Sequence, residues 1–164
     1  MELTRVDPTT VQIGKLDALL VELLRRVSTA ADPSGSEAAR TRLFSAPTHD
    51  ENEAELLEDW QDVVMPELET LFQSALDVVE RDLKTLRVNQ KNGEGQLRLP
   101  MDHLEKWIHA LNQARLALAA RHDFSEKDLD RIFPLTGDSR ALALLQIRFY
   151  GLLQELFLRE LEDE

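Results

Sequence analysis

Residues 141–161 are apolar on almost every side of the helix that their spacing predicts, and this constrains the fold more than any other feature. The large apolar side chains in this segment are Leu142, Leu144, Leu145, Ile147, Phe149, Tyr150, Leu152, Leu153, Leu156, Phe157, Leu158 and Leu161. A helix that is hydrophobic all round has to be covered, by other helices of its own chain or by a second chain. Arg148, Glu155 and Arg159 interrupt the segment, and a charge at mid-bilayer costs about 2.5 kcal/mol or more. We therefore expect the centre of a soluble helical bundle rather than a membrane span, with one face also suited to an oligomer interface.

The other apolar residues recur mostly at three- and four-residue intervals, which predicts further helices. We expect these helices over residues 15–27, 50–65, 66–87 and 102–122, with one or two more turns over 125–133. Pro66 removes a backbone donor and the apolar stripe rotates there, so we expect a break between two helices. Asp50 and Asp138 predict N-caps, and Asp102 with Glu105 predicts a capping box.

Two stretches outside these helices are predicted to be extended. Residues 1–14 suggest a small hairpin that turns around Pro8, and residues 97–99 are expected to pair with it. Residues 28–49 contain Pro33, Pro47 and four serines, which predicts an irregular linker. We assign residues 1–164 to a single all-α domain, an irregular bundle of about five helices around the apolar C-terminal helix, with a small N-terminal β-hairpin.

Negative charge is concentrated in one part of the chain. Residues 43–80 contain eleven Asp and Glu and no Lys or Arg, whereas the remainder holds twenty acids against 19 bases. Glu55, Glu58, Asp59 and Asp62 form the candidate acidic interaction surface. Such a surface attracts a basic protein or divalent cations. It is equally typical of a solvated face that maintains solubility, and the residues leave both interpretations open.

Arg115 is an anomaly on the helix expected over residues 102–122. It falls inside an apolar stripe made of Leu104, Trp107, Ile108, Leu111, Ala114 and Leu118. A guanidinium buried without a partner costs several kcal/mol, so Arg115 should meet a carboxylate or carbonyls, with Glu155 as one candidate. This predicts an internal ion pair that fixes helix register, or alternatively a site for an anion or a partner's carboxylate. We group Asn112, Arg115, Arg121 and Glu155 as the candidate polar cluster between the two long helices.

Signatures of catalysis are missing from the sequence. The chain has no cysteine, no P-loop, no H-E-x-x-H and no G-x-S-x-G. Glu105 and His109 lie one helical turn apart and could share a metal, but the Glu-x-x-His motif of di-iron bundles is absent. We therefore expect no catalytic residue, no metal and no cofactor.

One segment resembles a known protein family. The sequence WIHALNQARLAL at 107–118, followed by Arg121, resembles the pattern W-L-x-A-L-N-D-x-R-L-x-L-x-x-R of an uncharacterised, mainly actinobacterial domain of unknown function. Arg42-Leu43-Phe44 and residues 150–156 are similar to two further segments of that family. Ser45 and Gln113 depart from it, since the family usually has proline and often has aspartate there.

This resemblance implies a helical fold and no established activity. The family's genes often lie beside the adaptor of the Clp protease, so the resemblance also implies a link to regulation or proteolysis. We expect a non-enzymatic cytoplasmic module that binds a protein partner, which the acidic surface predicts to be basic, and that self-associates. The net charge of −12 argues against binding to nucleic acid or membranes. A carboxylate-rich metal-dependent enzyme and a transcriptional regulator are the alternatives.

Overall fold

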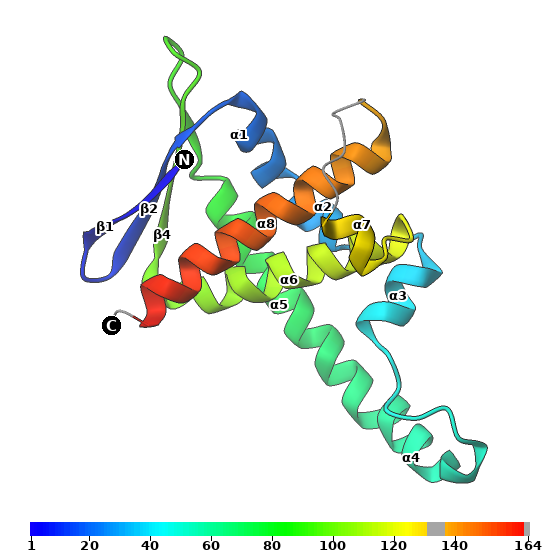
Figure 1. The fold of residues 1–164 in the computed structure, drawn as a ribbon. Coiled ribbons are helices and arrows are strands. Elements are labelled where there is room, and N and C mark those ends of the chain that lie inside the picture. The colour runs from blue at the N-terminus through cyan, green and yellow to red at the C-terminus, as the bar shows by residue number, and fades with distance from the viewer. Residues whose placement is uncertain (131–136, 163–164) are drawn as a thin grey trace.

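A four-stranded antiparallel sheet lies beside the helices, so the all-α prediction is wrong (Figure 1). The computed structural model describes residues 1–130 and 137–162. The strands are β1 (Glu2–Asp7), β2 (Thr10–Leu16), β3 (Arg87–Val88) and β4 (Gly95–Pro100), in the order β1-β2-β4-β3. The expected pairing of 97–99 with the hairpin is confirmed, because Val11 lies opposite Leu99 and Ile13 opposite Leu97. A hairpin alone is marginal in water, and with this added strand the side chains of Val11, Ile13, Leu97 and Leu99 are fully buried on one face of the sheet.

Helices make up most of the described chain. Their bounds are α1 (Ala18–Arg25), α2 (Val27–Ala31), α3 (Glu37–Leu43), α4 (Ala54–Asp59), α5 (Met65–Leu83), α6 (Leu104–Arg121), α7 (Glu126–Asp130) and α8 (Ser139–Glu162). Short 3-10 turns precede α4 (Glu51–Glu53) and α6 (Met101–His103), and a π-helical turn, Trp60–Val64, joins α4 to α5. The turn predicted around Pro134 lies outside the described residues.

The central helix is α6 rather than the C-terminal helix that the sequence favoured. It contacts α2, α3, α5 and α8, and Ala110, Ala114 and Ala117 are fully buried along it. Small side chains let neighbouring helices approach on several sides, because interaxial distance depends on the residues at the contact. Alanine contributes little to an apolar stripe, which is why the sequence pattern underestimated how much of α6 is buried.

Helix α8 packs along α6 with one face left exposed. Leu152 and Leu158 are 48% and 47% exposed, so the prediction that α8 occupies the centre of the bundle is wrong. By length and composition α8 could cross a membrane, and half of its most apolar window is buried inside the fold. Asp138 caps the helix as predicted, since its Oδ1 accepts from the N–H of Ala141 at 2.7 Å.

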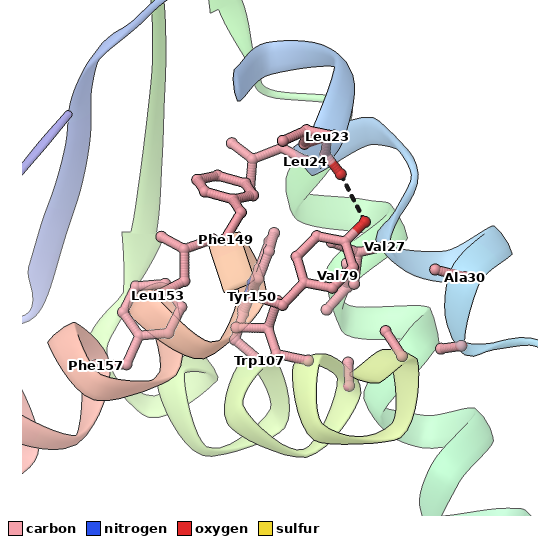
Figure 2. Packing of buried hydrophobic residues seen from close by; sticks show 14 of the residues in the cluster. Leu23, Leu24, Val27, Ala30, Val79, Trp107, Phe149, Tyr150, Leu153 and Phe157 are labelled. Atoms are coloured by element: carbon pink, nitrogen blue, oxygen red, sulfur yellow. Dashed lines mark hydrogen bonds between the residues drawn. The ribbon is translucent and has the colours of Figure 1, made fainter. Parts of the chain in front are cut away.

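Tyr150 ties α8 to α1 at the middle of the core (Figure 2). Its hydroxyl donates to the carbonyl of Leu23 at 2.8 Å and accepts from Nε2 of Gln146 at 3.1 Å. Burial raises the pKa of Tyr150 to about 12, because the phenolate would lose its hydration. Nearby, the rings of Trp107 and Phe157 meet edge to face with centroids 6.2 Å apart.

Residues 28–49 are not the irregular linker that their composition predicted. They contain most of α2 and all of α3. The Ser36 hydroxyl accepts from the N–H of Ala39 at 3.2 Å and so caps α3. Ala39 and Leu43 then pack against Ala117 of α6. Capping and burial therefore stabilise short helices in a segment whose prolines had led to the prediction of irregular structure.

The helical path continues through Pro66 instead of breaking there. Pro66 occupies the first turn of α5, where a missing N–H costs little. The preceding π-helical turn closes with the N–H of Met65 donating to the carbonyl of Trp60. One extra residue in that turn rotates the apolar stripe, and this produced the signal of a break. The predicted capping box at Asp102 is also absent, because α6 starts without a side-chain cap.

Candidate functional site

Arg115 meets a side-chain carbonyl, one of the two kinds of partner that the sequence predicted, and the partner is the neutral amide of Gln154 rather than the candidate Glu155. Its Nη1 donates to Oε1 of Gln154 at 2.5 Å, and Nε2 of Gln154 donates to the carbonyl of Ile108 at 3.0 Å. The guanidinium lies against Gly151, where an added Cβ would be 3.5 Å from it. Glu155 instead pairs with Arg159 at 2.5 Å on the exposed face of α8. The contact joins α6 to α8 without burying an ion pair.

The remaining members of the candidate polar cluster lie apart from this contact. Arg121 donates from Nη1 to the carbonyl of Ala30 at 2.9 Å, which ties the end of α6 to α2. Asn112 is exposed on α6. The structure therefore distributes Asn112, Arg115, Arg121 and Glu155 over several surfaces, and it forms no single site from them.

A buried polar group that the sequence interpretation missed is centred on Asp82 of α5. The carboxylate is 6% exposed and accepts from Nε1 of Trp107 at 2.8 Å. Nδ1 of His103 lies 3.0 Å from each carboxylate oxygen. Asp82 follows Ala75 and Val79 at helical spacing, so an acid inside an apolar stripe was the signal that could have revealed it.

The candidate acidic surface lies on a helical projection, which we call the acidic arm (residues 54–71). It comprises α4, the π-helical turn and the start of α5, and it extends away from the sheet and from α8 (Figure 1). Glu55, Glu58, Asp59 and Asp62 are all exposed along it. The arm also exposes Leu56, Val63 and Leu71, at 47%, 57% and 40%. Carboxylates and large apolar side chains are therefore presented together.

A cleft of about 680 Å³ opens where the arm joins the body. Its walls come from α2, the loop after α2, α3, α5 and α6. At its mouth Arg40 pairs with Glu69 at 3.1 Å, and the rings of Phe44 and Phe72 lie 5.5 Å apart. Hydrogen bonds from the hydroxyl and N–H of Ser34 hold the pKa of Asp32 below its usual value, so this lining carboxylate is ionised.

Gln113 of α6 lies at the inner side of this cleft and is 3% exposed. Its Nε2 donates to the carbonyl of Ala31 at 3.2 Å. Its Oε1, like the Oγ of Ser28 in the same cleft, is enclosed without a hydrogen-bond partner in the described structure. The sequence interpretation treated Gln113 only as a departure from a family pattern.

No group of three or more His, Asp and Glu side chains within residues 1–130 and 137–162 is arranged to hold a metal ion. Glu105 and His109 are both exposed on α6. In the described chain, enclosed side-chain polar atoms without a hydrogen bond occur in the cleft, at Ser28 and Gln113, in the acidic arm, at Nε1 of Trp60, and at the contact between α6 and α8, at Nε of Arg115.

Comparison with known proteins places the chain in a family. No curated protein and no solved structure matches it. A family model, "Domain of unknown function (DUF2017)", matches residues 5–161, from within β1 to the penultimate residue of α8, and so includes the acidic arm. The chain therefore belongs to the DUF2017 family of domains of unknown function.

Proposed function

We propose that this protein is a non-enzymatic interaction module that binds a basic, amphipathic segment of a partner protein along the acidic arm. The observation that carries the proposal is the combination found on the arm. Six carboxylates and no Lys or Arg occur in residues 54–71, together with exposed Leu56, Val63 and Leu71.

Each half of this combination has its own physical role. Clustered carboxylates steer a cationic partner and orient it, but exposed ion pairs add little affinity because water screens them. Exposed apolar side chains supply the affinity, at roughly 25 cal/mol for each Å² that is buried. An amphipathic partner segment with a basic margin satisfies both requirements at once, in the manner of a helix laid against a groove.

The arm's position supports this role. The arm projects away from the sheet and from α8 (Figure 1), and none of its residues belongs to the main hydrophobic core of the described chain. At the root of the arm, Glu69 forms an exposed ion pair with Arg40 of α3. The arm can therefore contact a partner without rearranging the hydrophobic core. We further propose a cytoplasmic location and the link to Clp proteolysis that the family resemblance implies.

The test is affinity capture from the source cell with two matched variants. One variant changes Glu55, Glu58, Asp59 and Asp62 to Gln or Asn. The control changes the same number of exposed acids elsewhere, namely Glu94, Glu105, Glu126 and Glu162. Both remove the same charge, so net charge alone cannot distinguish them.

The proposal expects the first variant to lose its partner and the control to retain it. The recovered partner should contain a segment with basic and apolar residues at helical spacing. Equal recovery by the two variants would show that the arm is only a solvated face.

A further inference from the structure

Two polar atoms in the cleft lack partners, and they point to what it binds. Oε1 of Gln113 and Oγ of Ser28 are enclosed without a hydrogen bond in the described residues, and both residues line the same cleft. Buried polar groups are nearly always hydrogen-bonded, so an enclosed acceptor of this kind is one that a donor group bound in the cleft would satisfy.

The orientation of the Gln113 amide is determined by its other contact. Nε2 donates to the carbonyl of Ala31 at 3.2 Å. Exchanging the two amide atoms would place Oε1 against that carbonyl, where two acceptors repel each other. The free atom of Gln113 is therefore an acceptor, and a ligand must bring an N–H or O–H to it.

The charge of the cleft selects a cationic donor. Asp32, Glu69 and Glu80 line it, against Arg40 as the lining cation. Ammonium and guanidinium groups carry donors only, and they form hydrogen bonds to carboxylates and amide oxygens that are stronger than neutral ones. A neutral hydroxyl would satisfy Gln113 but would make no use of the carboxylates.

The chain itself shows that the mouth of the cleft accommodates a guanidinium. Arg40 pairs with Glu69 at 3.1 Å, and its guanidinium carbon lies 5.8 Å from the centroid of the Phe44 ring. Phe72 packs against Phe44 on the same wall. This wall therefore supplies both an anion and an aromatic face, the two features that retain a basic side chain.

We propose that the cleft is the anchor site for a lysine or arginine side chain presented by the partner that docks on the acidic arm. The stem of that side chain lies along Phe72, and its charged head reaches Gln113 and Ser28. Arg40 competes for Glu69 at the mouth. The proposal rests on the proposed function for the identity of the partner, and it adds the residue that the partner must provide.

Nuclear magnetic resonance titration of the full chain tests the recognition directly. The probes are acetyl-arginine amide and acetyl-lysine amide, with acetyl-citrulline amide as the uncharged analogue of arginine. We expect the two cations to shift the side-chain amide resonances of Gln113 and the backbone resonances around Ser28 and Phe72. Citrulline amide should bind about tenfold more weakly, because it lacks the charge.

Two variants should change the affinity in opposite directions. Gln113→Leu removes the acceptor and should weaken binding of acetyl-arginine amide about tenfold. Arg40→Ala removes the competing guanidinium and should strengthen it. Arg40 is exposed, so this second variant tests the site even if Gln113→Leu fails to fold.

Comparing free arginine with acetyl-arginine amide distinguishes a site for a partner's side chain from a site for a soluble metabolite. If the blocked amide binds as tightly as free arginine, the cleft recognises the side chain alone, as an anchor site requires. A strong preference for free arginine would overturn the anchor role. Absence of shifts in the cleft, equal binding of citrulline amide or weaker binding by Arg40→Ala would each overturn the site.

Failure of the anchor-site proposal can be distinguished from failure of the proposed function. The capture experiment depends on Glu55, Glu58, Asp59 and Asp62, none of which lines the cleft. If capture of the partner still requires the arm but is unaffected by Gln113→Leu and Arg40→Ala, the proposed interaction module stands and the anchor site is wrong.

Discussion

The indole N–H of Trp107 donates to the carboxylate of Asp82 at 2.8 Å, and this bond joins α6 to α5 in the interior. His103 lies against the same carboxylate. Replacing Asp82 with Ala would leave the indole donor and the imidazole without their acceptor. We expect a loss of about 3 kcal/mol in the free energy of unfolding, measured by urea denaturation. Asp77→Ala, at an exposed position of the same helix, should change stability by less than about 0.5 kcal/mol. Equal effects of the two changes would refute the structural role of Asp82.

Arg115→Met tests the contact between α6 and α8. Because Arg115 bonds to the neutral amide of Gln154, its removal strands no charge. The free energy of unfolding should fall by about 1 kcal/mol, the usual net value of one hydrogen bond. Glu155→Gln, which touches only the exposed pair with Arg159, should be nearly neutral. A loss of several kcal/mol for Arg115→Met would point to a buried ion pair instead.

Two glycine substitutions should change the stability of the protein in opposite directions. A Cβ at Gly151 in α8 would lie 3.5 Å from the Arg115 guanidinium, an ordinary contact. Gly151→Ala should therefore stabilise the protein by about 0.5–1 kcal/mol through helix propensity. A Cβ at Gly95 in β4 would overlap Val21, so Gly95→Ala should destabilise by about 1–3 kcal/mol. Thermal unfolding of both variants provides the comparison, and stabilisation by Gly95→Ala would contradict the packing of β4 against α1.

Stability should fall at alkaline pH through Tyr150. Its pKa is raised to about 12 in the folded protein from 10.0. The unfolded chain therefore releases this proton first, and stability is lost as pH rises from about 10 to about 12. The full contribution is about 3 kcal/mol, since each pKa unit corresponds to 1.36 kcal/mol. Tyr150→Phe should lack this part of the pH dependence, whereas an identical alkaline profile would show that Tyr150 is not buried as a neutral phenol.

Hydrophobic periodicity predicted individual elements better than their assembly. The pairing of β4 with β2 was predicted, because Leu97 and Leu99 alternate with polar residues. The centre of the fold was predicted at the wrong helix. Some leucines of α8 are exposed, so its apolar composition overstates its burial, whereas the buried alanines of α6 give only a weak apolar signal. Burial of a small residue depends on the neighbours that approach it, and local spacing does not contain that information.

The candidate site was predictable where charge alone defines it. The run of acids without cations identified the arm, which the structure shows to be exposed. The cleft was not predictable, because Ser28, Arg40 and Gln113 come from three helices that meet only in the folded chain. The Arg115 contact was partly predicted, since a carbonyl partner was allowed and α8 held one candidate, Glu155, but the partner on α8 is Gln154.

Photo-crosslinking in the source cell tests the central claim most directly, by asking which surface touches the partner. A photoreactive residue would replace Val63 on the acidic arm, and in separate variants Val6 on β1 or Leu158 on α8, which have comparable exposure. The account predicts an adduct with a basic partner from position 63 and none from positions 6 or 158. Adducts from position 6 or 158, with none from position 63, would contradict it.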